Sequence, residues 1–316
     1  MSDQSQSAPF FSLVIPVHNR PELLQQTIDS VLGQSHPDRE IIVVDDASDD
    51  GTPAVLRAYG DRIRVVTLPE SRGCEVARNE GAAVARGVYL AFLDSDDLLF
   101  PWALATYDFV LRATGRPALL VSRIAYFNTE PPAAAGQPPG PTVDLVEFPD
   151  YLSRDRSIGS TASMIVVRRD VFTHVEGFRS STAKTFNMSD HDFLMRVGCA
   201  SPAIYLENPQ TVAYRVHPGN SIRNLRRVAE GILRLVAAER RGAYPGGTGR
   251  KFDRYASIGG PLAFWGLQAL KHGEPRLGLR VLLTGCPMIL AKAWKRIATQ
   301  AKGLRPMTTL LRPEVR

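Results

Sequence analysis

The chain has 316 residues, a length that suits one large domain or a catalytic domain with an appendage. With 44% hydrophobic and 22% charged residues, it has the composition of a globular protein, which excludes wholesale disorder and a fibrous repeat. The formal net charge of +6 hides an asymmetry: residues 1–222 carry 19 Lys/Arg against 27 Asp/Glu, or −8, and residues 223–316 carry 19 against 5, or +14.

The N-terminal residues 1–9 form a polar leader, which we expect to be flexible. It has neither the basic start nor the apolar stretch of a secretory signal. No uninterrupted run of about 18 apolar residues occurs, so we expect no membrane-spanning helix. The three cysteines, Cys74, Cys199 and Cys286, are far apart and have no metal-type spacing. These features together predict a cytoplasmic protein.

Short apolar runs and helical patterns alternate along the first part of the chain. Pro21 suits the first turn of a helix and Gly33 suits its end. The predicted strands cover residues 11–17, 41–44, 63–67 and 88–93, and the predicted helices cover residues 21–32, 53–59 and 74–86. This alternation predicts an α/β fold with a parallel sheet and helices on both of its faces.

Beyond residue 110 the pattern is less regular. Residues 131–141 are rich in Pro and predict a surface loop, because Pro cannot donate to a ladder of hydrogen bonds. Residues 163–168 and 212–216 predict two more strands. The tail is helical in pattern, with Pro287 as an interruption, and its predicted helices cover residues 228–241, 255–271, 276–283 and 289–299.

Polar and acidic clusters follow three of the predicted strands, at residues 18–20, 45–46 and 94–97. Parallel strands bring their carboxyl ends to one edge of the sheet, where ligands bind. Several carboxylates at one edge repel one another unless a cation is present, and hard oxygen ligands favour Mg²⁺ or Mn²⁺ completed by substrate phosphates. The clusters therefore predict a divalent ion holding a diphosphate; the alternative is that these aspartates only cap helices and turns.

Other phosphate and ion sites lack their signatures. Residues 46–51 mimic the start of a calcium loop, but the twelfth position is Arg57 and not Glu. No Gly-rich dinucleotide fingerprint and no Gly-Lys-Ser/Thr phosphate loop occurs. Metal and side chains must then hold the diphosphate.

Four segments in order, residues 11–22, 41–52, 73–79 and 89–97, resemble the motifs of family-2 glycosyltransferases with the GT-A fold. The resemblance implies an α/β fold, a mostly parallel sheet flanked by helices, with a C-terminal helical extension. It implies a catalytic domain over 10–222, with a nucleotide-binding half (10–110) and an acceptor half (111–222), followed by a basic helical region over 223–316.

The resemblance also implies roles on the donor side. Asp46 would accept a base N–H, Arg78 would face the diphosphate, and Asp96 would bind the metal. Asp94 would reach the ribose or metal, beside Ser95. The residues expected to border the nucleotide after the first strand are Pro16, Val17, Asn19, Arg20 and Glu22.

On the acceptor side, residues 189–192 resemble the family's Glu-Asp motif at a helix start, although Ser189 stands where Glu is usual. Asp190 would be the general base that removes the acceptor hydroxyl proton in an inverting transfer. We expect Ser189 to cap the helix and Asp192 to be structural. His217 would ligate the metal or donate to the departing diphosphate.

The resemblance thus implies a metal-dependent, inverting glycosyltransferase that uses Mn²⁺ or Mg²⁺. It would move a sugar from a UDP-, GDP- or dTDP-linked donor to a glycan, lipid-linked or other hydroxyl acceptor, in polysaccharide assembly. The alternatives are a non-catalytic sugar-nucleotide-binding or partner-binding subunit and, less favoured, a nucleotidyltransferase, whose Gly-rich signature is missing.

The basic tail leaves three alternatives open. Lys292, Lys295, Arg296 and Lys302 flank apolar residues in a way that suits a helix on an anionic membrane surface, which would place the protein peripherally on the inner face of the plasma membrane. The tail could instead pack on the body, or form a contact in a homo-oligomer. A nucleic acid partner is not expected.

Overall fold

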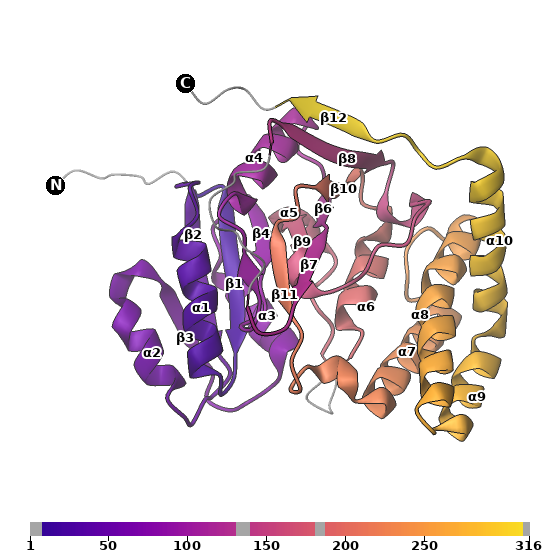
Figure 1. The fold of residues 1–316 in the computed structure, drawn as a ribbon, viewed down its shortest axis with the longest axis horizontal. Helices are drawn as coiled ribbons and strands as arrows, with labels where there is room; N and C mark the ends of the chain where they lie inside the picture. Colours follow the sequence, from indigo (N-terminus) through magenta and orange to yellow (C-terminus); the bar gives the residue numbers. More distant parts are fainter. Residues whose placement is uncertain (1–7, 131–139, 181–186, 312–316) are drawn as a thin grey trace.

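The computed structural model describes residues 8–130, 140–180 and 187–311. Most of the leader predicted over 1–9, and most of the Pro-rich segment predicted over 131–141, lies outside the described residues. Within the described part, helices cover both faces of a large central sheet, and a group of helices forms one end of the molecule (Figure 1). The predicted α/β class is confirmed.

The central sheet has nine strands and is parallel through its first four in space. The strand predicted near residues 163–168 runs antiparallel to both of its neighbours, because no crossover helix precedes it to allow parallel pairing. The strands are, in spatial order, β3 (Arg64–Thr67), β2 (Arg39–Asp45), β1 (Phe11–Val17), β4 (Tyr89–Phe92), β9 (Ile165–Arg168), β6 (Leu119–Ser122), β10 (Ala203–Asn208), β8 (Thr142–Phe148) and β12 (Thr308–Leu311).

A small second sheet stands beside the first and consists of β5 (Leu98–Leu99), β11 (Val212–Arg215) and β7 (Ile124–Phe127). It joins segments that are far apart in sequence, because β11 pairs with β5 on one side and with β7 on the other. As a result, the end of β11 lies against the turn that follows β4.

Most of the helices begin close to the residue at which the sequence pattern predicts a helix start. Pro21 is in the first turn of α1 and Gly33 follows its last residue, as predicted. The α-helices are α1 (Pro21–Leu32), α2 (Thr52–Tyr59), α3 (Cys74–Val84), α4 (Ala103–Ala113), α5 (Arg169–His174), α6 (Ser189–Arg196), α7 (Leu225–Arg240), α8 (Lys251–Lys271), α9 (Pro275–Thr284) and α10 (Cys286–Lys302). Short 3₁₀ turns cover Gly60–Arg62, Tyr151–Ser153, Ala162–Met164, Val197–Cys199, Ser221–Arg223 and Thr248–Arg250.

Burial on both faces of the central sheet explains why its strands are continuous apolar runs in the sequence. All seven residues of β1 are buried, because both faces of the sheet are covered. Leu13 and Ile15 pack against α1 and α4 on one face, and Val14 packs on the other face with α3, α5 and α6. Gly81 lets α3 approach closely, since a Cβ there would meet Val14 Cγ1 at 2.5 Å.

The C-terminal helices share one hydrophobic cluster with the preceding part of the chain, including Leu152 and Met195. Pro287 does not interrupt a helix as predicted: it lies in the first turn of α10, where its missing N–H costs nothing. The break falls before Cys286 instead. Within the described residues, no single helix is long and apolar enough to cross a membrane; α9 and α10 meet that test only as a pair, with a 68° bend between them. The unpredicted β12 then returns to the sheet and pairs with β8.

Candidate active site

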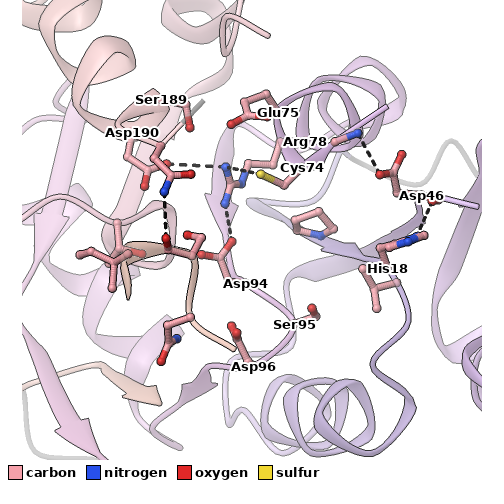
Figure 2. A pocket seen from close by; sticks show the side chains of 18 of the residues that line it. His18, Asp46, Cys74, Glu75, Arg78, Asp94, Ser95, Asp96, Ser189 and Asp190 are labelled. Carbon is pink, nitrogen blue, oxygen red and sulfur yellow. Dashed lines mark hydrogen bonds and ion pairs between the residues drawn. The ribbon is translucent and has the colours of Figure 1, made fainter. Parts of the chain in front are cut away.

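A cavity of about 400 Å³ opens at the carboxyl ends of β1, β2 and β4, where α3 and α6 begin (Figure 2). This is the edge at which sheets with parallel strands bind ligands. The residues predicted for the site that line the cavity are Pro16, Val17, Arg20, Asp46, Arg78, Asp94, Ser95, Asp96 and Asp190. The sequence motifs of the two halves therefore meet in one place.

Two residues predicted to border the nucleotide, Asn19 and Glu22, do not line the cavity. The Asn19 side chain joins the loops after β1 and β2 instead: its Nδ2 donates to Asp49 Oδ1 at 2.7 Å, and its Oδ1 accepts from the Asp49 N–H at 3.0 Å. Asn19 has φ 53°, a left-handed conformation that Asn tolerates better than most residues. Glu22 is exposed in the first turn of α1. The structure thus places both outside the candidate site.

Asp46 organises the entrance to α3. Its carboxylate accepts hydrogen bonds from Ser71 Oγ at 2.9 Å, from the Arg72 N–H at 2.7 Å and from the Gly73 N–H at 2.9 Å. Three donors on one carboxylate hold the turn that leads into α3 in a fixed position, and this turn lines the cavity. Asp46 is buried and borders the cavity beside His18 (Figure 2).

Arg78 connects the two halves of the site. Its side chain is only 5% exposed, with Nη2 at 2.5 Å from Asp94 Oδ1 and Nη1 at 3.6 Å from Asp190 Oδ1 (Figure 2). Burial opposes its charge, but the carboxylates of Asp94 and Asp190 outweigh that effect, and the pKa of Arg78 is raised. The guanidinium is therefore a fixed positive charge at the centre of the cavity.

Asp190 faces Arg78 from the first turn of α6. Burial raises the pKa of Asp190 to about 6; Arg78 opposes the rise, and the nearby carboxylates of Asp94 and Glu75 add to it. Asp190 Oδ1 has no hydrogen-bond partner among the described residues. The side chain is still 21% exposed and lines the cavity, so a bound ligand can reach it.

The start of α6 differs from the prediction for Ser189. The helix is preceded by Met188, which has φ 102°, and Ser189 is already the first helical residue. Ser189 makes no capping hydrogen bond; it is buried and lines the cavity. A positive φ in a non-Gly residue costs free energy, and such conformations are concentrated at functional sites.

Asp96 lies at the other side of the cavity, between a cation and an imidazole. Its Oδ2 is bonded by Arg20 Nη1 and lies 3.0 Å from His217 Nε2. His217 does not line the cavity itself, but it reaches Asp96, which does. Within the described ranges, no three Asp, Glu, His or Cys side chains come close enough together to hold a metal ion.

Asp97 helps to hold the turn that contains Asp96 in place. Its carboxylate accepts from Ser163 Oγ at 2.6 Å and from the Arg215 N–H at 2.9 Å. Burial raises the pKa of Asp97, and the neighbouring Asp96 and Asp94 raise it further. Arg215 Nε also donates to the Asp96 carbonyl oxygen at 3.0 Å, so the end of β11 fixes the turn that carries Asp96.

Sequence reasoning missed several residues of the site. Cys74 and Glu75 line the cavity, and their i, i+4 and i, i+3 spacing to Arg78 would have placed them on the same helix face. An arginine within a buried strand, as at Arg215, was a second usable signal. Ser163 had no local signal, because its partner Asp97 is 66 residues away.

Comparison with known proteins gives a consistent result. A family model described as glycosyl transferase family 2 matches residues 12–174, just over half of the chain. Among curated relatives, TuaG of Bacillus subtilis (strain 168), a protein named for teichuronic acid biosynthesis, is 48% identical over 92 residues (28% of this chain, 36% of TuaG). The O-antigen biosynthesis protein RfbC of Myxococcus xanthus is 33% identical over 201 residues (62% of this chain, 15% of RfbC). The match thus covers about a third or less of these relatives' own length.

Solved structures have the same fold at low sequence identity. Staphylococcus aureus TarS 1–349 in complex with UDP-GlcNAc aligns with a TM-score of 0.57 at 15% identity, over 93% of this chain and 92% of that chain. The mannosyltransferase PcManGT from Pyrobaculum calidifontis, in complex with GDP-Man and Mn²⁺, aligns with a TM-score of 0.55 at 18% identity, over 94% and 87%. With the family model and the GT-A architecture in agreement, the chain belongs to glycosyl transferase family 2.

Proposed function

We propose that this protein is a metal-dependent, inverting glycosyltransferase that moves a sugar from a nucleoside-diphosphate donor to a hydroxyl acceptor. The observation that carries the proposal is the pairing of Arg78 with Asp94 on one side and Asp190 on the other, inside one cavity. A cation suited to phosphate and a carboxylate suited to accept a proton therefore lie side by side in the wall of a cavity that a sugar can enter.

The donor diphosphate would bind near Arg78 and Arg20. A guanidinium presents a planar fork of N–H donors that matches phosphate oxygens, and both arginines line the cavity. The complexes of TarS with UDP-GlcNAc and of PcManGT with GDP-Man support a nucleotide sugar as the donor. Asp46, Asp94 and Ser95 would contact the nucleoside part.

The donor atoms near Asp96 fit a hard divalent cation. A carboxylate and an imidazole nitrogen lie within 3.0 Å of each other there, and Mn²⁺ or Mg²⁺ takes the rest of its ligands from substrate phosphates. Asp96 and His217 would hold the ion once Arg20 turns from Asp96 toward the diphosphate. When bound, the ion stabilises negative charge on the departing diphosphate.

Asp190 would act as the general base. Its carboxylate, in a side chain that is 21% exposed and lines the cavity, can accept the proton of an acceptor hydroxyl while that oxygen attacks the anomeric carbon from the side opposite the diphosphate, which inverts the configuration. With a pKa of about 6, Asp190 is mostly ionised at neutral pH and is a stronger base than an ordinary aspartate. Arg78 keeps it oriented and supports the ionised form.

The acceptor would be a growing polysaccharide or its lipid-linked precursor. This part of the proposal rests on relatives named for teichuronic acid and O-antigen biosynthesis. The walls of the cavity on the acceptor side come from the start of α6 and from residues 220–222.

A panel of UDP-, GDP- and dTDP-linked sugars tests the proposal, with release of nucleoside diphosphate measured with Mn²⁺, with Mg²⁺ and with a chelator. We expect turnover of at least one donor, lost on chelation. Donor binding without any turnover, with acceptor glycans present, would favour a non-catalytic sugar-nucleotide-binding subunit. Absence of binding to every nucleotide at millimolar Mn²⁺ would refute the proposal altogether.

A further inference from the structure

The outer face of α9 and α10 exposes a row of large apolar side chains. Its members are Leu279 (52% exposed), Leu283 (74%), Leu290 (63%), Trp294 (65%) and Ile297 (58%). Their spacing of three and four residues within each helix places them on one side of that helix. We call this surface the α9–α10 face. An exposed apolar surface of this kind usually marks an interaction site.

The opposite side of α10 is attached to the rest of the molecule. Met288 is buried, Lys295 Nζ donates to Asp253 Oδ1 at 2.7 Å and to the Leu152 carbonyl at 3.0 Å, and Lys292 Nζ donates to Ser157 Oγ at 3.1 Å. Lys292 and Lys295, two of the residues expected to suit a membrane surface, therefore point toward the body. The apolar row is on the side that faces away from it.

The charged residues of α9, of α10 and of the segment up to residue 311 have a single sign. Residues 275–311 contain seven Lys/Arg and not one Asp or Glu. Of these, Arg276 and Arg280 are exposed, and each precedes a leucine of the row, Leu279 or Leu283, by three residues, which places them beside the apolar row; Arg296 and Lys302 are also exposed. Figure 1 shows α10 at the edge of the molecule, at the end opposite to α2 and β3, where a large flat partner can approach it.

We propose that the α9–α10 face docks on an anionic lipid bilayer. The apolar row would enter the boundary between head groups and acyl chains, and the arginines would contact lipid phosphates. A second copy of the chain fits less well, since a symmetric contact would bring these cations against one another without an acidic partner. This proposal goes beyond the transfer reaction and does not depend on it.

Vesicle sedimentation of the full chain tests the proposal. We expect binding to phosphatidylcholine vesicles that contain about a quarter phosphatidylglycerol and little binding to pure phosphatidylcholine. Leu290→Ser with Trp294→Ser should lower the partition coefficient by at least about tenfold, since two apolar anchors are lost. The matched control is Phe264→Ser: this side chain is similarly exposed at 53% but lies on the side of α8 away from α9, so binding should be unchanged.

A charge reversal tests the electrostatic part separately. Arg280→Glu should weaken binding about tenfold or more and reduce its salt dependence, whereas Arg57→Glu, exposed on the distant α2, should leave both unchanged. Trp294 provides a second readout that leaves the α9–α10 face unchanged. With Trp102 and Trp265 replaced by Phe, its fluorescence should shift to the blue on adding anionic vesicles.

Three results would overturn the proposal. The first is equal pelleting with neutral and anionic vesicles; the second is unchanged binding of the Leu290/Trp294 variant. The third is a concentration-dependent dimer that this variant abolishes, without vesicle binding, which would identify a second copy as the occupant. Release of nucleoside diphosphate from a soluble donor should be the same in all of these variants, so a failure here is distinguishable from a failure of the proposed reaction.

Discussion

Replacing Asp190 by Asn tests the assignment of the general base. Burial raises the pKa of Asp190 from 3.8 to about 6. Ionising this carboxyl therefore costs ~3 kcal/mol more in the folded protein than in the unfolded chain. The general base must be ionised, so kcat/KM of the wild type should fall below about pH 6. Asp190→Asn cannot accept the proton and should lower kcat by a factor of about 10² to 10⁴, while nucleotide binding is retained.

The same shift has a consequence for stability. A carboxyl whose pKa is raised by folding contributes stability below pH 3.8, and this is lost as the pH rises through about 6. Asn carries no such group. The free energy of unfolding of Asp190→Asn relative to wild type should therefore increase across this window, by at most ~3 kcal/mol.

The assay is the initial rate of nucleoside diphosphate release from about pH 4.5 to pH 8.5, with nucleotide affinity measured by calorimetry and stability by urea unfolding. Asp170→Asn replaces an exposed carboxylate on α5 outside the cavity; it is the matched control and should keep the acid limb and the rate of the wild type. The reasoning is refuted if Asp190→Asn keeps the acid limb of the profile, or keeps a rate within about threefold of wild type.

Arg78→Gln should weaken nucleoside diphosphate binding about ten- to hundredfold in calorimetry, because charge-assisted bonds to phosphate are lost, and it should move the acid limb of kcat/KM to higher pH, since Arg78 lowers the pKa of Asp190. An unchanged affinity would place the diphosphate elsewhere. Asp96→Asn should remove the Mn²⁺ dependence of nucleotide affinity, and a retained dependence would contradict its role as a metal ligand. Gly87→Ala should cost about 1–3 kcal/mol in urea unfolding, because its Cβ would meet the Ser12 backbone nitrogen at 2.5 Å. Gly159→Ala, which has open space around it, should change stability by less than about 0.5 kcal/mol; equal costs at both positions would show that crowding is not the cause.

The fold of residues 10–110 could be predicted well from the sequence. Its strands are apolar runs and its helices begin and end at residues with local conformational preferences, such as Pro21 and Gly33. The acidic clusters after β2 and β4 also lie at strand ends, so the order of elements alone predicts that they share one edge of the sheet. These signals arise from residues that are close together in the sequence, so they can be recognised without knowledge of the tertiary structure.

Contacts between distant residues were decided only by the tertiary structure. The bonds of Asp97 to Ser163 and to Arg215 span 66 and 118 residues, and no local pattern encodes such a pairing. Asn19 lies in a segment that resembles a family motif. Its side chain nevertheless forms hydrogen bonds with Asp49 and does not line the cavity. The antiparallel strands β8, β9 and β12 likewise depend on partners brought in from elsewhere in the chain.

In the basic tail, too, some features are set by the sequence and others by the tertiary structure. The sequence by itself determined that residues 223–316 are helical in pattern and strongly positive. Which lysines face the body, and which apolar residues face outward, depends on how α10 packs against α8 and on the acceptors that Lys292 and Lys295 find there. Amphipathic periodicity specifies that a helix has two faces, but only packing selects the one that is buried.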